Sequence, residues 1–371
     1  NHDVGSIVQQ GLVLALLISI PAMLFSYYAQ PILLALGQEP GLAHASGKYF
    51  HLYMLSTPSL LLSIVFQQFL LAVGYQRTVL IANALAFFVA IAVAYLLIFG
   101  HFGFPKVGIS GLAIAYIISN TFTLLWYLAY ILWQKKFRQY TLFRWRFRST
   151  WPFLRKLFDI GWPISANAGG DLLSFFLTTI MVGWLGSQAL QAQQISTQYM
   201  ILFLVPLLAI AQSSGILVSR AYGSRDFLHM KKYNLFSLYI SFAIAFVIFI
   251  LFCFFSHYFI AAYIDTHLPQ NRHLVILTTI LLLLSTGRLL FDSIMNVCTG
   301  SLRGLFDTKY PMVIGLVARV IVYLPVAYVV GFSLGGGLIG ITLANIVLCL
   351  LSSYVLWRRW QKKVRRCEQP I

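Results

Sequence analysis

The sequence predicts an all-α polytopic membrane protein. Hydrophobic residues make up 60% of its 371 residues and charged residues only 9%, whereas a soluble domain usually carries about 25% charged residues. The mean hydropathy of +0.82 agrees with this, and the apolar residues are gathered into long runs. Membrane-spanning strands are excluded, because these runs are far longer than a barrel strand and lack its alternation of polar and apolar residues.

Each apolar run predicts one membrane-spanning helix, since about 20 residues are needed to cross a bilayer. In chain order the ten runs are 8–35, 49–74, 79–100, 109–133, 157–185, 190–219, 233–262, 274–303, 311–331 and 337–360. Pro21, Pro58, Pro163 and Pro206 interrupt four of the runs and predict kinks, which serve either as bending points or as static packing features. No run remains for a separate soluble domain.

The basic residues indicate how the helices are oriented. Lys and Arg number 26 against 9 Asp and Glu, which gives a net charge of +17. If the basic linker 134–156 is cytoplasmic, alternation leaves only Lys48, Lys106 and Arg272 on the opposite side. This asymmetry follows the positive-inside rule and predicts a multi-pass plasma-membrane protein, a bacterial inner membrane being expected, with both visible ends in the cytoplasm. The spread of charge over helix ends argues against nucleic-acid binding.

Two acidic residues, Asp171 and Asp292, lie deep inside apolar runs. A carboxylate at membrane depth is costly, so one that is found there usually faces a cavity and handles ions, protons or a polar substrate. These two residues are therefore the first candidates for function. The eight histidines are scattered and predict no metal site, and the four cysteines show no paired spacing and are expected to be free, small apolar side chains.

The second half of the chain repeats the first. The string GYQRT from Gly74 corresponds to GLFDT from Gly304, and GISGLAIAYII from Gly108 corresponds to GLIGITLANIV from Gly337, each about 230 residues further on. The second copy has six predicted helices and the first has four. The repeat thus predicts a twelve-helix, 6+6 arrangement in two lobes, of which ten helices are visible and two are expected before Asn1.

This repeat also divides the chain. The predicted parts are an N-lobe remainder of four helices (1–133), the basic cytoplasmic linker (134–156), a C-lobe of six helices (157–363) and a cytoplasmic tail (364–371).

Several strings resemble the multidrug and toxic compound extrusion (MATE) transporters. They are QQGLVLALLISIP from Gln9, PILLALGQEP from Pro31, IGWPIS from Ile160, LQAQQIS from Leu190, GSLRGLFDT from Gly300 and LPVAYVV from Leu324. Any one of them is weak, but their order and spacing together are specific. The resemblance implies two six-helix lobes around a central cavity, which move drugs or metabolites outward against the entry of sodium or protons, with no cofactor.

The resemblance assigns roles to both buried acids. The family has an acid eight residues after the proline of its GxPI string, which is Asp171 after Pro163 here, and another eight residues before the glycine of GSLRG, which is Asp292 before Gly300. Both are expected to bind the coupling ion or proton. The structural alternative for Asp171 is a carboxylate that only accepts hydrogen bonds from Asn167 and nearby hydroxyl groups.

Arg288 lies four residues before Asp292, so the two side chains are expected to meet on one helix face. Arg288 then acts as a modulating, tethered cation where some relatives bind sodium, or the pair is only a structural ion pair. Arg319 is expected to extend to the cytoplasmic interface rather than to line the cavity. The three groups Asp171, Asp292 and Arg288 would then carry a net charge of about −1.

Further candidates for the cavity lining share helical spacing with these acids. Asn167 and Ser174 lie one turn from Asp171, and Gln194, Gln198 and Tyr199 recur on the next helix. Hydrogen bonding between helices explains the second set equally well.

The predicted function is that of a secondary active antiporter, which exports organic cations, drugs or metabolites in exchange for protons or sodium by alternating access. A lipid or lipid-linked saccharide flippase is the alternative, because Arg288 and Arg319 would suit an anionic head group. An enzyme is not expected, since no arrangement of His, Asp and Ser for hydrolysis is visible. The expected partners are an amphipathic or cationic small molecule and the bilayer, and the expected oligomeric state is a monomer.

Overall fold

A computed structural model describes residues 2–35, 40–100, 102–103, 105–140, 142, 150–266 and 268–368. Every regular element in these residues is helical. The chain forms two compact units, Asn1–Phe158 and Asp159–Ile371, called the first and second unit below. The boundary falls close to residue 157, where the C-lobe was expected to begin. Part of the predicted linker, 143–149, lies outside the described residues.

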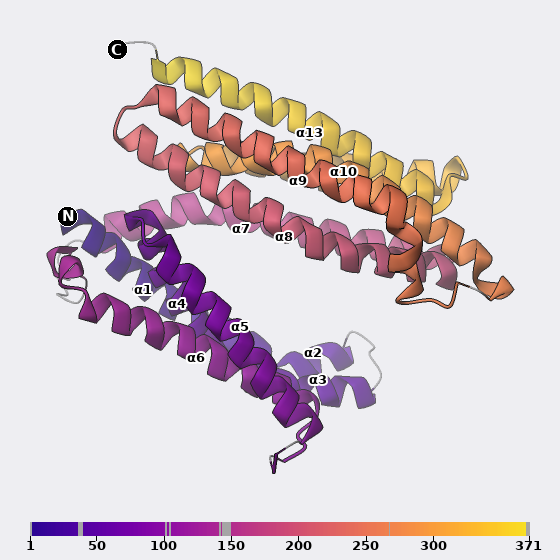
Figure 1. Ribbon diagram of the computed structural model, residues 1–371, viewed down its shortest axis with the longest axis horizontal. Helices are drawn as coiled ribbons and strands as arrows, with labels where there is room; N and C mark the ends of the chain where they lie inside the picture. The colour runs from indigo at the N-terminus through magenta and orange to yellow at the C-terminus, as the bar shows by residue number, and fades with distance from the viewer. Residues whose placement is uncertain are drawn as a thin grey trace. The chain divides into compact units, whose positions relative to one another are not determined.

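The first unit is built from helices (Figure 1). They pack around aromatic and aliphatic side chains. They are α1 (His2–Tyr27), α2 (Ala29–Ala35), α3 (Pro40–Tyr53), η1 (Met54–Ser56), α4 (Thr57–Val73), α5 (Gln76–Phe99), α6 (Ile109–Trp133) and η2 (Lys135–Tyr140). Leu70 and Tyr127 are fully buried in this core. The Tyr127 hydroxyl donates a hydrogen bond to Asn83 Oδ1 at 3.2 Å, which satisfies its only polar group.

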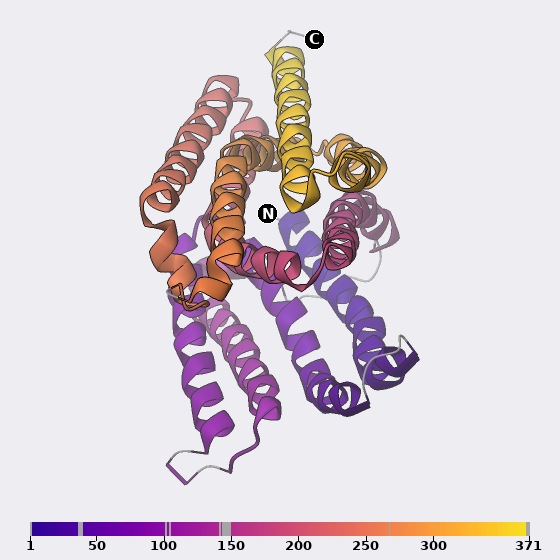
Figure 2. The same ribbon diagram turned by 90° about the vertical axis from the view of Figure 1, so that its right-hand side faces the viewer.

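The second unit contains longer helices. They are α7 (Thr150–Trp184), which begins before the unit boundary, α8 (Ser187–Gly223), α9 (Phe227–Ala261), η4 (Pro269–Asn271), α10 (Arg272–Gly304), α11 (Lys309–Leu316), the π-helical η5 (Val317–Tyr323), α12 (Leu324–Tyr328), the π-helical η6 (Val329–Ser333) and α13 (Gly337–Glu368). In both ribbon views α13 (yellow) lies beside α10 (orange) (Figure 1 and Figure 2). Helix α7 begins at Thr150, inside the predicted linker 134–156, and α13 continues to Glu368, inside the predicted tail 364–371.

Nine helical segments in the described residues are long and apolar enough to cross a membrane. They coincide with nine of the ten predicted runs. The tenth run, 157–185, also forms a helix, α7, but it is not among the nine. The polar side chains of Asn167 and Asp171 lie in the middle of α7 and lower its hydropathy there.

Helix ends follow the local sequence. Pro58 lies in the first turn of α4, where a missing N–H costs nothing. The 3-10 turn η1 comes directly before it within the single span Ala43–Val73, so the regular helix is interrupted at Pro58 as predicted. Gly74 ends α4 with φ of 99°, a left-handed conformation that suits glycine. Asp226 caps α9 by accepting a hydrogen bond from the His229 amide at 3.1 Å, and this bond lowers the pKa of the Asp226 carboxyl.

The string GSLRGLFDT holds the C-terminal part of α10 against its neighbours. A Cβ atom on Gly300 would overlap the backbone carbonyl of Ala211 in α8, so only glycine allows this approach. The neighbouring Ser301 hydroxyl shares a hydrogen bond of 2.8 Å with Ser214 Oγ and accepts one of 2.7 Å from Asn234 Nδ2 in α9. Three helices are thereby joined at one buried polar point, as helices in membranes commonly are.

The end of the same string joins α13. The Asp307 carboxylate accepts hydrogen bonds from Arg359, at 3.0 Å from Nε and 2.8 Å from Nη2. The Arg359 guanidinium also lies over the Tyr310 ring, 4.4 Å from its centroid. These contacts fix the long C-terminal helix against the end of α10, and so fix the positions of the residues that α13 presents further along.

Candidate functional site

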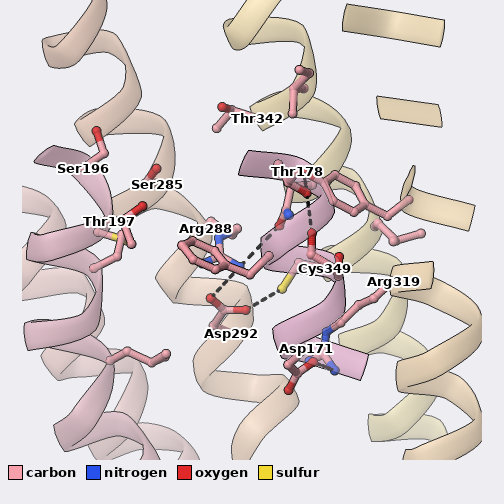
Figure 3. A pocket seen from close by; sticks show the side chains of 18 of the residues that line it. Asp171, Thr178, Ser196, Thr197, Ser285, Arg288, Asp292, Arg319, Thr342 and Cys349 are labelled. Carbon is pink, nitrogen blue, oxygen red and sulfur yellow. Dashed lines mark hydrogen bonds and ion pairs between the residues drawn. The ribbon is translucent and has the colours of Figure 1, made fainter. Parts of the chain in front are cut away.

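A cavity of about 550 Å³ lies within the second unit and is lined from α7, α8, α10, η5 and α13. This volume falls within the range of about 300–1,000 Å³ that is usual for small-molecule sites. Both sequence-predicted acids, Asp171 and Asp292, are among its lining residues. Figure 3 shows their carboxylates in the same view, with Arg288 and Arg319 beside them.

Asp292 is held on both of its oxygens. Arg288 Nη1 lies 3.2 Å from Asp292 Oδ2, one helical turn away on α10, as the sequence predicts. The thiol of Cys349 on α13 donates a hydrogen bond of 2.9 Å to Asp292 Oδ1 (Figure 3). Arg288 in turn donates to Asn345 Oδ1 at 3.3 Å. The Asp292 side chain is only 4% exposed, so this carboxylate is fixed in place by its neighbours.

Asp171 is arranged differently. Its Oδ1 forms an ion pair with Arg319 Nη1, which comes from η5 rather than from its own helix. The same guanidinium nitrogen donates to Asn167 Oδ1 at 3.4 Å. The Asp171 side chain is 45% exposed, which leaves part of the carboxylate open to the cavity. Asn167, which was expected to support Asp171 directly, instead supports the cation beside it.

The position of Arg319 corrects a prediction. Arg319 lines the cavity and contacts Asp171 instead of extending to the cytoplasmic interface. The predicted net charge of about −1 becomes zero, because two guanidinium groups balance two carboxylates among the lining residues. The physical reason is that the negative charge of Asp171 stabilises the Arg319 guanidinium in a partly buried position.

Local backbone features bring Arg319 to Asp171. A Cβ atom on Gly315, one turn before Arg319, would overlap Asn167 Oδ1, so glycine permits the close approach of α11 to α7. Arg319 itself lies in the π-helical η5. Such segments are rare and often occur at functional sites, because the wider turn changes the direction in which a side chain points. Thr178 Oγ1 adds a second link from α7, a hydrogen bond of 3.3 Å to the Tyr323 hydroxyl.

The lining of α8 differs from the expected set. Ser174 on α7 lines the cavity, but α8 contributes Gln193, Ser196 and Thr197. Gln194 and Gln198 are exposed and are not among the lining residues. The Tyr199 hydroxyl donates a hydrogen bond of 2.8 Å to the Phe259 carbonyl of α9. One residue along a helix turns a side chain by about 100°, and this separates the two sets.

Two oxygen atoms in the cavity wall have no partner among the described residues. Gln193 Oε1 and Ser196 Oγ are buried and make no hydrogen bond, and Ser196 is only 5% exposed. Buried polar atoms are nearly always satisfied, so such atoms point to a water molecule or a ligand. No group of three or more His, Cys, Asp or Glu side chains in the described part of the chain is placed to hold a metal ion.

Sequence reasoning missed three residues of this site. Arg319 was placed elsewhere, Cys349 was treated as an apolar filler, and Asn345 was not considered. The available signal was the spacing of Asn345 and Cys349, four residues apart, which puts them on one face of α13. No signal along the chain indicated that this face meets Arg288 and Asp292.

Comparison of the sequence with known proteins shows a consistent relationship. The family model described as MatE matches residues 1–96 and 170–329. A probable multidrug resistance protein NorM of Mesorhizobium japonicum is 30% identical over 98% of this chain and 78% of its own length. The corresponding protein of Brucella suis is 31% identical over 96% of this chain and 77% of its own length.

Solved structures show the same fold at lower identity. A MOP superfamily transporter from Pyrococcus furiosus has a TM-score of 0.87 and 17% identity, covering 99% of this chain and 80% of that one. An outward-facing multidrug resistance MATE transporter has a TM-score of 0.87 and 15% identity, covering 99% and 84%. The all-helical architecture, the matched family segments and the relatives together show that this chain belongs to the MatE family of MATE membrane transporters and is not an enzyme.

Proposed function

We propose that this protein exports amphipathic small molecules, including organic cations and drugs, in exchange for protons or sodium. The relatives named as multidrug resistance proteins support the export of drugs. The exchange mechanism rests on one observation: two carboxylates line one cavity, and each is paired with a guanidinium group.

The two carboxylates have different parts in this proposal. Asp171 is the exchange site, because its carboxylate is partly open to the cavity and its partner comes from another element. Asp292 is held by Arg288 and Cys349 and is nearly inaccessible. It maintains the charge of the cavity and keeps Arg288 in position. Arg288 thereby acts as the modulating cation that the sequence suggested.

Exchange follows if Asp171 binds only one cation at a time. In the empty state its partner is Arg319, and a proton, a sodium ion or the cationic group of a substrate then competes for the same carboxylate. Each of these occupants shifts the balance between inward-open and outward-open arrangements. A difference of a few kcal/mol between the two arrangements is enough to drive exchange.

The flippase alternative is less well supported. An anionic lipid head group would need guanidinium groups that are available for binding. Arg288 and Arg319 are both paired with carboxylates in the described structure, so a head group with only a negative charge would leave one of these carboxylates without a counter-charge. We also propose that the protein works as a monomer. The distribution of its basic residues supports a cytoplasmic position for both visible ends.

A transport assay tests the proposal. The purified protein is placed in proteoliposomes, and uptake or release of a fluorescent cationic dye is followed under an imposed proton gradient and, separately, an imposed sodium gradient. The Asp171→Asn variant keeps the size of the side chain and removes its charge. Asp265→Asn, in the loop after α9, serves as the matched control because it removes a carboxylate outside the cavity lining.

Transport that is driven by one gradient, retained in Asp265→Asn and lost in Asp171→Asn supports the antiporter and identifies its ion. Gradient-independent transport, or full activity in Asp171→Asn, contradicts it. In that case, lipid scrambling in the same vesicles would favour the flippase over the antiporter.

A further inference from the structure

The cavity does not attract simple cations by its charge. Its lining includes Asp171, Asp292, Arg288 and Arg319, and contains no Lys, His or Glu among the described residues. Their formal charges sum to zero. Arg303 is not part of the lining, but its positive charge also acts on Asp171. The electrostatic potential at this carboxylate is therefore more positive than the lining residues alone would make it.

Only one of the two ion pairs is arranged to open. Asp171 and Arg319 come from separate elements, α7 and η5, and their side chains are 45% and 25% exposed. Arg288 and Asp292 share one helix, and further bonds to Asn345 and Cys349 hold them. A ligand can therefore separate Asp171 from Arg319 without disturbing the packing between α10 and α13.

The charge of the ligand decides what this separation costs. A ligand with a single positive charge can replace Arg319 at Asp171, but it leaves the guanidinium without a counter-charge at membrane depth. A ligand with a single negative charge leaves Asp171 in the same condition. An uncompensated charge in an apolar region is strongly unfavourable. A ligand that carries both charges gives each residue a new partner, and no charge is left alone.

The rest of the lining suits an amphipathic molecule of this kind. Leu172, Phe175 and Leu204 provide apolar surface for an aromatic body. Gln193 Oε1 and Ser196 Oγ, buried and without partners, are acceptors for an N–H group. Figure 3 shows Ser196 and Thr197 on α8, away from the Asp171 and Arg319 side chains.

We infer that the preferred substrates of this cavity are zwitterionic amphipathic compounds, and that Arg319 determines this specificity. Arg319 binds the anionic group of the substrate and Asp171 binds its cationic group. This inference rests on the proposed export function and adds a substrate class to it. The charge-balanced pair gives specificity in two ways: it binds ligands that carry both charges, and it disfavours ligands that carry only one.

A matched pair of dyes tests the inference. Rhodamine B carries a free carboxylate beside its cationic xanthene, and its ethyl ester keeps the cation but has no carboxylate. Equilibrium binding to the purified protein is measured for both by fluorescence anisotropy. The wild type is expected to bind rhodamine B about tenfold more tightly than the ester. Arg319→Gln is expected to reverse this preference, because Asp171 is then unpaired and favours the ester.

Further variants separate specificity from folding. Arg319→Lys retains the positive charge and should keep the preference for rhodamine B. The double variant Asp171→Asn with Arg319→Gln removes both charges and should bind the two dyes about equally. Arg272→Gln, at the start of α10 and outside the cavity lining, removes a remote charge and should behave as the wild type.

Gradient-driven transport of both dyes completes the test. Tighter binding of the ester by the wild type, an unchanged preference in Arg319→Gln, or no binding of either dye would overturn the inference. If the ester is preferred and is still driven by a gradient, the inference fails while the export function stands. If neither dye is moved by any gradient, the export function itself fails.

Discussion

Helix α10 of the second unit and helix α4 of the first are counterparts in the repeat, yet only α10 has charged side chains. Counted back from Gly304 and from Gly74, Leu62 stands where α10 has Asp292, and Pro58 stands where it has Arg288. Both copies are helical: α4 ends directly before the repeated glycine, Gly74, and α10 ends at Gly304. The repeat therefore specifies where helices lie, whereas the chemistry in the described residues is concentrated in one copy.

The packing of the two helices differs in the same way. Gly300 of α10 touches the backbone of α8, but the equivalent residue of α4 is Leu70, a fully buried side chain in an apolar core. The second unit uses glycine to bring backbones together around polar groups, and the first uses large side chains to fill its core. Four substitutions test how α10 and the side chains that contact it are held, the first two with a counterpart in α4, and they are ordered from the largest expected effect to the smallest.

Asp292→Ala should be the most damaging, because it leaves Arg288 without its counter-charge at membrane depth. We expect a loss of about 3–5 kcal/mol, measured as a lower thermal unfolding midpoint of the detergent-solubilised protein. Leu62→Ala, at the equivalent position of α4, is half-buried and should cost less than about 2 kcal/mol.

Replacing the pair together sharpens this test. Arg288→Met combined with Asp292→Leu should recover much of the stability, because no unpaired charge remains. An Asp292→Ala protein as stable as the wild type would show that the ion pair is not needed to hold α10.

Gly300→Ala should cost about 1–3 kcal/mol, since the added methyl group meets the rigid backbone carbonyl of Ala211 rather than a movable side chain. Size-exclusion profiles and thermal unfolding report the change. Leu70→Ile at the equivalent position should cost less than about 1.5 kcal/mol. Equal effects at the two positions would remove the distinction between backbone packing and side-chain packing.

Cys349→Ala removes the hydrogen bond to Asp292 and should cost about 1 kcal/mol, because one oxygen of a buried carboxylate loses its donor. Cys349→Ser keeps a donor at the same place and should retain most of the stability. The pH profile of transport provides the second readout: alanine should shift it and serine should not. A shift of equal size in both variants would mean that volume, and not hydrogen bonding, is what Cys349 contributes.

Asn345→Ala should have the smallest effect, about 0.5–1 kcal/mol, because its bond to Arg288 is long at 3.3 Å and Arg288 keeps its carboxylate partner. Unfolding of the purified variant measures it. A loss as large as that of Asp292→Ala would show that Asn345, and not the ion pair, fixes Arg288.

Much of this architecture follows from the sequence alone. Apolar length predicts the helices, and the spacing of Arg288 and Asp292 predicts their contact, since residues four apart share a helix face. The cost of a buried carboxylate singles out Asp171 and Asp292, both of which line the cavity. Each of these inferences depends on helix geometry or on the cost of placing a residue in a bilayer. Both can be judged from the residue types and their spacing along the chain.

The remaining features depend on contacts between distant segments. Arg319 is 148 residues from Asp171, and only the close approach of α11 to α7 at Gly315 and the π-helical turn bring the two together. Gln193 lines the cavity and Gln194 does not, and this depends on how α8 is rotated about its axis. The spacing of polar residues identifies a polar stripe, but not the direction that the stripe faces.

Competition at Asp171 is the central claim, and equilibrium binding tests it most directly. The affinity of the purified protein for rhodamine B is measured while pH is lowered, and again while sodium is raised at fixed pH. If one ion shares Asp171 with the substrate, that ion weakens binding in the wild type and has no effect on the residual binding of Asp171→Asn. The same ion dependence in both proteins, or no ion dependence in the wild type, would contradict the account.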